Sequence, residues 1–380
     1  MDLSISDTHR QFQSTFEAFC QRQVAPRAAA TDRRGTLDEA SWKDLQEMGF
    51  FQLYHEERWG GTRADWLMRA LAEESLAKAC AATFLSAGAS VGLCGGPIAA
   101  HGTEAQKDRW LRGLATGDRI GCFGLTEPDA GSDAAALRTR AVADGDGWRL
   151  NGEKALITNA PIADVAVVMA VTDPDAGHFG VTSFIVDLSA PGVSRTAPYE
   201  KLGLRGSPTG GLVFEDVRLG PDDVLGVPGA GFVQAMQTLE FGRISMAHFG
   251  IGIAEAAFEA ACRYAQERVA FGKPISSRQA IHFKIADMKI QLDAARLMAR
   301  KVAWMKDEGL PCQDMASVAK CYATEMAVRV ADAAVQIFGG WGYTSEFPVE
   351  RLLRDARLGP IGEGTSEIQR ELIARAMLDT

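Results

Sequence analysis

Apolar residues in the first third of the chain recur at spacings of three and four. Phe12, Phe16 and Phe19 follow this spacing, which places apolar side chains on one face of a helix. The stretch over residues 65–80 is rich in Ala, Leu and Glu, and such residues favour helices. The pattern therefore predicts an all-helical N-terminal domain over residues 1–118.

The pattern changes near residue 120, where β-branched residues alternate with polar ones and Gly, Pro and Asp interrupt them. Val165–Val171 and Val181–Val186 are short apolar runs, typical of buried strands. Asp144-Gly-Asp-Gly-Trp148 separates two strand-like runs, and its composition favours a hairpin turn. We therefore expect a middle β domain over residues 119–226.

A helical period returns in the last third of the chain. Ile285, Met288 and Leu292 keep the spacing of three and four, and residues 316–338 are predicted to form one long helix that two glycines end. Long helices joined by short loops suggest a bundle, which we expect over residues 227–380. The chain is thus predicted to be mainly α with a central β domain, packed as one unit.

Composition and charge exclude several classes of function. The chain has 380 residues and a formal net charge of −9, and it contains no Lys/Arg run. This argues against a nucleic-acid partner. The N-terminus lacks the basic and apolar regions of a signal peptide, and the longest clean apolar run, Val165–Val171, is too short to span a bilayer. These features predict a cytoplasmic protein without a membrane span.

Cysteine and histidine usage gives no sign of disulfides or metals. The seven cysteines are an odd number and include no CxxC pair, which favours reduced, buried thiols. The six histidines show no metal-ligand spacing. We expect no metal site.

The most suggestive stretch for chemistry lies near the C-terminus. Glu363 stands between Gly362 and Gly364, just before Thr365, which is a good N-cap for a last helix. Flanking glycines allow close approach of a ligand and leave room around the carboxylate. Glu363 is therefore a candidate general base. Alternatively, the stretch is a glycine-rich turn with a solvated Glu that favours the helix dipole.

Other polar stretches suggest a cofactor. Residues 123–133 and 151–159 are irregular loops beside apolar strands, with hydroxyls at Thr126, Ser132 and Thr158. Together they could form two walls of a pocket for a flat ring with polar edges, although each alone is more often a turn.

A second set of candidates lies in the helical C-terminal part. Arg268 could grip a pyrophosphate in bidentate fashion, and Phe271 could lie against a ring. Gln336 and the bare backbone of Gly339 and Gly340 would suit a nucleotide. The alternatives are a charged helix end with a buried Phe, and a simple C-cap.

These motifs occur in a fixed order: Thr126–Asp133, Arg268 with Phe271-Gly-Lys273, Gln336 with Gly339-Gly340, and Glu363–Gln369. In this order they resemble the acyl-CoA dehydrogenase family of flavoproteins, and the resemblance runs from the first helix to the last. It implies an α-helical N-terminal domain, a β-barrel-like middle domain, a C-terminal four-helix bundle and a homotetramer. It also implies FAD between the β domain and the bundle, with its adenosine end reaching a neighbouring subunit.

The resemblance assigns roles residue by residue. Glu363 matches the usual catalytic base, and Gly242 stands where some members carry the base instead. Positions that match FAD contacts are Phe123, Leu125, Thr126, Leu156, Thr158, Arg268, Phe271, Gln279, Gln336, Gly340, Thr365 and Glu367. Positions that match contacts to the thioester substrate are Ser132, Glu240, Arg243 and Gly364.

The implied reaction is the α,β-dehydrogenation of an acyl thioester. Glu363 would take the α-proton while the β-hydride passes to flavin N5, and an electron-transferring flavoprotein would accept the electrons. In a dry pocket the pKa of Glu363 should be raised. The substrate would be an acyl-CoA or an acyl-carrier protein.

Three residues depart from the family pattern. Leu156 replaces a Trp beside the flavin, Gly362 replaces a Tyr just before the base, and Ala270 replaces a hydroxyl that helps bind FAD. A wider pocket suggests a substrate that is bulkier or more polar near C2–C3, such as a carrier-protein-bound intermediate. Two other interpretations remain: an oxidase that uses oxygen on the same fold, and a homologue that binds without catalysis.

Overall fold

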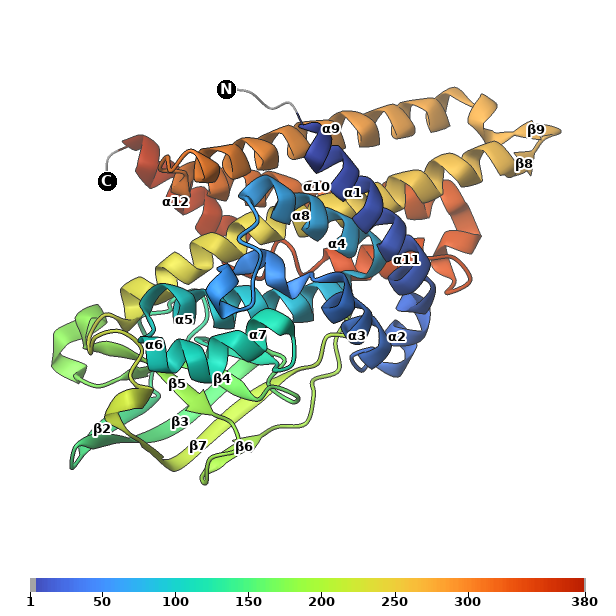
Figure 1. Cartoon of the computed structure of the whole chain (residues 1–380). Helices are drawn as coiled ribbons and strands as arrows, with labels where there is room; N and C mark the ends of the chain where they lie inside the picture. Colours follow the sequence, from blue (N-terminus) through green and yellow to red (C-terminus); the bar gives the residue numbers. More distant parts are fainter. Residues whose placement is uncertain (1–4, 379–380) are drawn as a thin grey trace.

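The computed structural model describes residues 5–378, and its first part is helical, as the periodicity predicts (Figure 1). Asp65 caps the longest of these helices by accepting a hydrogen bond from the Met68 N–H at 2.7 Å. Gly49 ends an earlier helix in the left-handed conformation, with φ +78°. The α-helices of this part are α1 (Asp7–Phe19), α2 (Ala28–Arg34), α3 (Glu39–Met48), α4 (Trp66–Gly88), α5 (Gly95–His101), α6 (Glu104–Gln106) and α7 (Arg112–Thr116).

The middle part is a seven-stranded sheet in the order β1-β4-β2-β3-β7-β6, with β5 paired to β4. The predicted hairpin is confirmed, because Asp144 pairs with Gly147 in an antiparallel register. The predicted strands Val165–Val171 and Val181–Val186 are also confirmed, and nearly all their side chains are buried. The strands are β1 (Gly121–Gly124), β2 (Arg140–Asp144), β3 (Gly147–Thr158), β4 (Val165–Val171), β5 (Val181–Asp187), β6 (Val193–Arg195) and β7 (Thr209–Leu219).

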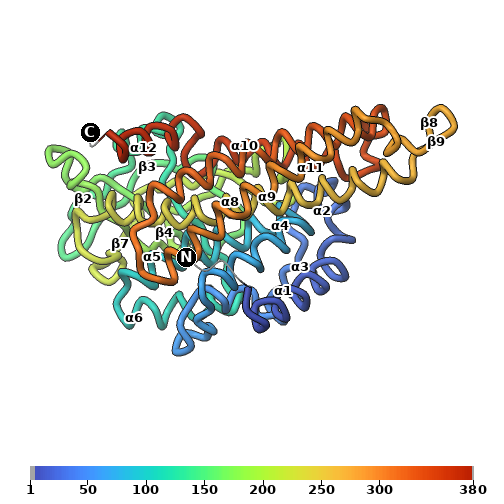
Figure 2. The backbone as a smooth tube through the Cα atoms, turned by 90° about the horizontal axis from the view of Figure 1, so that it is seen from above, coloured from blue at the N-terminus to red at the C-terminus, as the bar shows by residue number. Residues whose placement is uncertain are grey.

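The last part consists of long helices that run side by side (Figure 2). At Gly250, an added Cβ would lie 2.7 Å from the Ala323 main-chain oxygen, so this glycine lets two helices approach closely. The helices are α8 (Gly231–Glu267), α9 (Gln279–Asp307), α10 (Gln313–Phe338), α11 (Val349–Ala356) and α12 (Ser366–Leu378), and a small hairpin of β8 (Val269–Ala270) and β9 (Lys273–Pro274) joins α8 to α9.

One hydrophobic core joins the N-terminal helices to the C-terminal bundle. Phe16, Leu76, Phe249 and Met326 are all buried in it, although they come from both ends of the sequence. A separate cluster lies inside the β domain. The helical parts therefore pack on each other through α4 and α8, and the sheet lies beside the first half of α8 (Figure 1).

The segment Ala81–His101 is long and apolar enough to cross a membrane by length and composition. However, 78% of its apolar window is buried inside the protein, as in the core helix of a globular domain. Glycines and serines interrupt this segment, so it contains no long uninterrupted apolar run that would mark it in the sequence.

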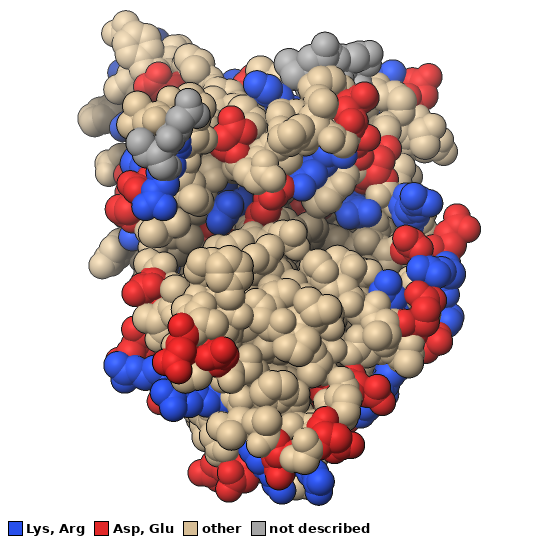
Figure 3. All heavy atoms as spheres, turned by 90° about the vertical axis from the view of Figure 1, so that its left-hand side faces the viewer, with Lys and Arg blue, Asp and Glu red and all other residues tan. Residues whose placement is uncertain are grey.

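The face on the left of Figure 1 has an uncharged centre ringed by acidic and basic side chains (Figure 3). The β domain and the segment after it contribute exposed apolar residues, among them Phe179, Val227 and Val233. All seven cysteines are free, and Cys262 is the one among them that is not fully buried.

Candidate active site

Glu363 lies in a tight turn between α11 and α12. Its φ is +54° and that of Gly364 is +86°. Left-handed backbone is costly for a non-glycine residue, by about 1–3 kcal/mol, and persists where the surroundings enforce it. Thr365 caps α12, as predicted, because its Oγ1 accepts a hydrogen bond from the Ile368 N–H at 3.3 Å. The Gln369 side chain donates to the Glu363 main-chain oxygen at 3.3 Å and so ties the turn to the helix.

The carboxylate of Glu363 packs directly on the backbone of α8 at Gly242. A Cβ added to Gly242 would lie 2.3 Å from Glu363 Oε2 and 2.8 Å from Cδ. The prediction that the flanking glycines make room for the carboxylate is therefore incomplete. Gly364 supplies the left-handed backbone, whereas the space for the acid comes from a glycine 121 positions earlier in the sequence.

The environment of Glu363 raises the pKa of its carboxyl toward neutrality. Its Oε2 is buried and accepts no hydrogen bond from residues 5–378. Burial raises the pKa of the carboxyl to about 7, and the positive charges of Lys320 and Arg243 act in the opposite direction. The expected raised pKa is thus confirmed, and desolvation is its main cause.

The expected loop over residues 151–159 is instead the end of strand β3 as far as Thr158, because its backbone pairs with β7, and the first polar loop lies beside it. The Ala155 N–H donates to the Thr126 main-chain oxygen at 2.9 Å. The buried Lys154 ammonium joins β3 to this loop, because it contacts the Glu127 carboxylate at 2.7 Å and the Leu125 oxygen at 3.2 Å. The sequence contains Glu127 and Lys154 within the two motifs, but their pairing is visible only in the structure.

The predicted contact residues of these loops differ in exposure. Leu125 is buried, whereas Phe123, Thr126 and Thr158 are half-buried. Leu156 is 65% exposed and has φ +58°, at an irregularity in the pairing of β3 with β7.

A second group of predicted cofactor residues lies at the far end of α8. Arg268 follows the last residue of this helix, and Phe271 is at the tip of the β8–β9 hairpin, where it is 94% exposed. The end of α10 joins this group, because the Tyr264 and Phe338 rings stack with centroids 4.0 Å apart. The exposed positions here are Arg268, Phe271, Gln279, Gln336 and Gly340.

The two groups cannot meet within one chain. Gly231, the first residue of α8, packs on Thr182 and Ser183 of the β domain, and Arg268 follows its last residue. A helix of 37 residues is about 55 Å long at 1.5 Å per residue. Figure 1 shows the β domain and the β8–β9 hairpin at opposite ends of the molecule.

The predicted substrate positions are also divided. Arg243 is buried one residue beyond Gly242, and Gly364 follows the base. Glu240 lies on another face of α8, where its carboxylate pairs with the Lys306 ammonium at 2.5 Å. Ser132 is exposed in the first polar loop of the β domain. Thr365 and Glu367 are at the start of α12, beside the base.

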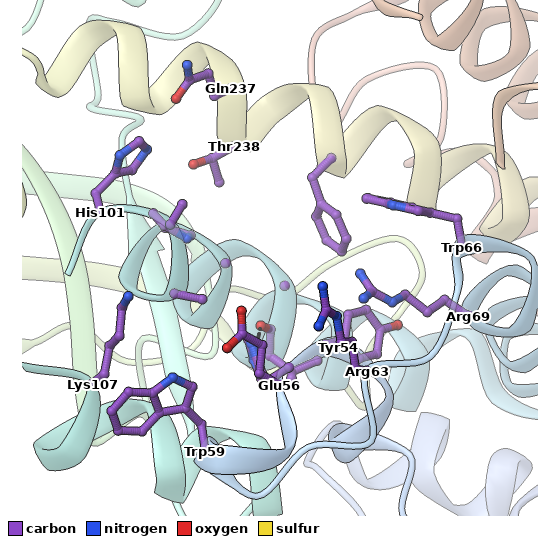
Figure 4. A pocket seen from close by; sticks show the side chains of 18 of the residues that line it. Tyr54, Glu56, Trp59, Arg63, Trp66, Arg69, His101, Lys107, Gln237 and Thr238 are labelled. Atoms are coloured by element: carbon purple, nitrogen blue, oxygen red, sulfur yellow. Dashed lines mark hydrogen bonds between the residues drawn. The ribbon is translucent and has the colours of Figure 1, made fainter. Parts of the chain in front are cut away.

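A cavity of about 450 Å³ lies beside α8, where Gln237, Thr238 and Phe241 of this helix line it (Figure 4). Aromatic and basic side chains line it, among them Tyr54, Trp66, Arg69 and Phe241. Glu363 is not part of its lining. Because successive residues of a helix point about 100° apart, Phe241 faces this cavity while Gly242 faces the base.

Sequence reasoning missed Lys320, which is fully buried on α10 and hydrogen bonds to the turn that carries the base. The hydrophobic pattern of this helix did contain a signal for Lys320. Lys320 stands on the same helical face as Ala316, Ala323 and Ala327, all buried, and a lysine on an apolar face is unusual.

Comparison with known proteins agrees with this architecture. Models of the acyl-CoA dehydrogenase N-terminal, middle and C-terminal domains match residues 6–118, 122–217 and 229–378. The probable acyl-CoA dehydrogenase YngJ of Bacillus subtilis is 45% identical and covers 100% of both chains. The human mitochondrial short-chain specific acyl-CoA dehydrogenase is 42% identical over 99% of this chain and 91% of its own length.

Solved structures match equally well. Butyryl-CoA dehydrogenase from Megasphaera elsdenii has a TM-score of 0.96 at 42% identity, covering 100% of both chains. A chain from the structure of the electron transferring flavoprotein of Acidaminococcus fermentans reaches 0.97 at 40% identity, again over both full lengths. The prolyl acyl carrier protein oxidase AnaB reaches 0.95 at 32% identity, covering 98% of this chain and 100% of that one.

The fold and these relatives place the protein among the oxidoreductases that act on CH–CH bonds. The chain belongs to the acyl-CoA dehydrogenase family. Its cofactor is FAD, which is also bound in a solved complex of the relative PigA.

The residues present fit this cofactor. At Gly131 and Gly340 an added Cβ would meet nothing within 4 Å, so the main chain there is open to a ligand. Leu156 and Phe271 hold apolar side chains out into solvent, at the β domain and at the hairpin respectively. Exposed apolar surface of this kind gains stability when a flat ring covers it.

Proposed function

We propose that this enzyme introduces the α,β double bond into an acyl thioester and that Glu363 is the base that takes the α-proton. The observation that supports this role most directly is the buried Oε2 of Glu363, which has no hydrogen-bond partner among residues 5–378 and is held in a strained turn against Gly242. A desolvated carboxylate with a pKa near 7 is matched to proton abstraction at neutral pH. When bound, FAD supplies the acceptor for the hydride that leaves the β carbon.

The residues of this chain would divide the remaining work. In the β domain, Phe123, Leu125, Thr126, Leu156 and Thr158 would contact the flavin ring, with Thr365 and Glu367 beside it. Arg268, Phe271, Gln279, Gln336 and Gly340 are about 55 Å away along α8, so we propose that they hold the adenosine end of a cofactor bound to a second copy. This arrangement would fit the expected homotetramer.

We also propose that the acyl group is short. Gly88 is buried, yet a Cβ added there would meet nothing within 4 Å, so an internal space lies beside it. Phe84 packs against Phe249 one turn before this space, and one turn after it the Phe241 ring fills the position of a Gly92 side chain. Phenylalanine rings thus bound this space about one helical turn away on either side, which favours a short acyl group over a long one.

The Phe84→Ala variant should accept longer chains. Each additional buried methylene is worth about 0.8 kcal/mol, so two more should raise the ratio of kcat/KM for hexanoyl over butyryl thioester roughly tenfold. The loss of the ring should also lower the unfolding free energy by about 3–5 kcal/mol. Phe51→Ala, equally buried but packed on Trp42, is the control. An unchanged chain-length ratio in Phe84→Ala would contradict the proposal.

The rate should depend on pH through Glu363. Because the base acts as the carboxylate and its pKa is about 7, kcat/KM should rise tenfold per pH unit well below pH 7 and level off above it. The profile is measured with the slowest substrate that still saturates the enzyme. A flat profile between pH 5.5 and 8 would exclude Glu363 as the base.

Two further points concern the carrier that presents the acyl group, CoA or a carrier protein, and the acceptor that takes the electrons. A Cβ added to Gly362 would make only ordinary contacts with Leu358, at 3.5 Å, so the turn has room for a small side chain there, and the glycine leaves that room to a bulkier acyl group. The relative AnaB acts on a carrier-protein substrate and is an oxidase, whereas most relatives are named for acyl-CoA. We favour acyl-CoA with an electron-transferring flavoprotein as acceptor. The cytoplasmic location stays a prediction.

The function is tested by anaerobic bleaching of the bound flavin with a panel of acyl-CoA and acyl-carrier-protein thioesters. Bleaching by short acyl-CoA is the expected result. Preference for a carrier protein would replace the proposed substrate, and peroxide formed during aerobic turnover would identify an oxidase. A colourless protein, or one that no thioester bleaches, would favour a homologue that binds without catalysis.

A further inference from the structure

Lys320 is fully buried in the middle of α10, and its ammonium donates to the Gly364 main-chain oxygen at 2.6 Å. Burying a lysine is costly unless its charge is compensated. The acceptor is the residue that follows the proposed base. α10 is therefore hydrogen bonded to the turn that presents Glu363.

The titratable groups around Lys320 come from α8, from α10 itself and from the turn. Glu363, Arg243, Cys321 and Glu325 are the groups that act on its ammonium. Glu325 already pairs with Arg370 at 2.7 Å. No carboxylate within the described range 5–378 lies within 4.0 Å of Lys320 Nζ, so Glu363 and Lys320 interact through their charges at longer range.

We propose that Lys320 is a positioning residue for Glu363: its ammonium, hydrogen bonded to the Gly364 main-chain oxygen, holds the left-handed turn in place. This inference rests on the proposed function of Glu363 as the base. The main-chain oxygen of Gly364 accepts two hydrogen bonds, from Lys320 and, at 3.1 Å, from Gln369. The bond from Lys320 is charge-assisted and so the stronger of the two.

The charge of Lys320 has a separate consequence from its hydrogen bond. Burial favours the neutral form of Glu363, whereas Lys320 and, after it, Arg243 favour the carboxylate. A base must be ionised before it can accept a proton. Without the ammonium, a larger fraction of Glu363 is protonated at neutral pH, and the enzyme needs a higher pH to reach the same rate.

Three substitutions separate the two contributions. Lys320→Met removes the charge and the donor, Lys320→Gln retains a donor without charge, and Lys320→Arg retains both. Ser317→Ala is the matched control, because Ser317 is buried one turn earlier on α10 and its hydroxyl has no partner in the part of the chain that the structure describes. It should leave the rate and the pH profile unchanged.

The readout is the pH profile of kcat/KM together with kcat at its plateau. Lys320→Met and Lys320→Gln should move the acid limb upward by about one pH unit, as expected when an opposite charge near a carboxylate is lost. Lys320→Arg should restore the position of the limb. The plateau kcat should fall roughly 100-fold in Lys320→Met, because a displacement of about 1 Å at a reacting group has this effect, and less in Lys320→Gln.

Two results would overturn the proposal. One is an acid limb that stays at the wild-type pH in both Lys320→Met and Lys320→Gln, which would leave Lys320 a purely structural residue. The other is measured by thermal unfolding, which does not depend on activity. The effects of Lys320→Met and Glu363→Gln on the unfolding free energy must be non-additive in the double variant. Strict additivity of these two effects excludes the coupling. A wild-type enzyme that no thioester reduces would instead refute the proposed function itself.

Discussion

Glu363→Gln should abolish dehydrogenation while leaving FAD bound. The amide has the shape of the carboxylate but cannot accept the α-proton, and general-base catalysis contributes about 10²–10⁴-fold. Because Glu363 packs on Gly242 and its Oε2 is unpartnered in the described part of the chain, we expect a loss near the upper limit. The measurement is the rate of anaerobic flavin bleaching by butyryl-CoA.

The same substitution should not destabilise the protein. The wild-type fold carries a buried carboxylate whose pKa is raised to about 7, and a neutral amide avoids the cost of burying that charge. The melting temperature and the visible flavin spectrum should therefore equal or exceed those of the wild type. A Glu363→Gln enzyme that keeps more than a tenth of the bleaching rate would show that another group is the base.

Gly242→Ala should lower the activity strongly while changing the stability little. The added methyl carbon would lie 2.3 Å from Glu363 Oε2, so the carboxylate must move by about an ångström or more. A displacement of this size costs roughly 100-fold in rate. In the middle of a helix, however, Ala is favoured over Gly by about 0.5–1 kcal/mol, and the displaced group is the flexible end of a side chain.

The unfolding free energy of Gly242→Ala should thus change by less than about 1 kcal/mol while kcat/KM falls about 100-fold. Gly96→Ala in α5 is the control, because a Cβ there would meet nothing within 4 Å. It should keep full activity. If Gly242→Ala retains wild-type kcat/KM, the carboxylate does not act from the position seen here.

Much of the fold could be predicted from local patterns. The hairpin at Asp144–Gly147, the buried strand Val165–Val171 and the N-cap at Thr365 all depend on residues close together in the sequence. Turn chemistry, capping and periodicity are short-range properties. The ordered motifs identified the family for the same reason, since each motif is a local segment.

Other features could not be predicted from residues that are close together in the sequence. The apolar segment Ala81–His101 is buried by side chains from distant parts of the chain. The parallel pairing of β1 with β4 joins two strands that are not consecutive in the sequence. The Lys154–Glu127 and Lys320–Gly364 contacts likewise join residues 27 and 44 positions apart. Such contacts depend on how the helices and strands pack.

By itself, the sequence determined the helical, β and helical order of the chain, the family and the acid most suited to be its base. Only the tertiary structure decided the burial, the contacts and the pKa of Glu363. Its raised pKa, its room against Gly242 and the hydrogen bond from Lys320 to the next residue depend on α8 and α10, which lie far from it along the chain. The physical reason is that desolvation and charge act through space, whereas sequence patterns report only neighbours along the backbone.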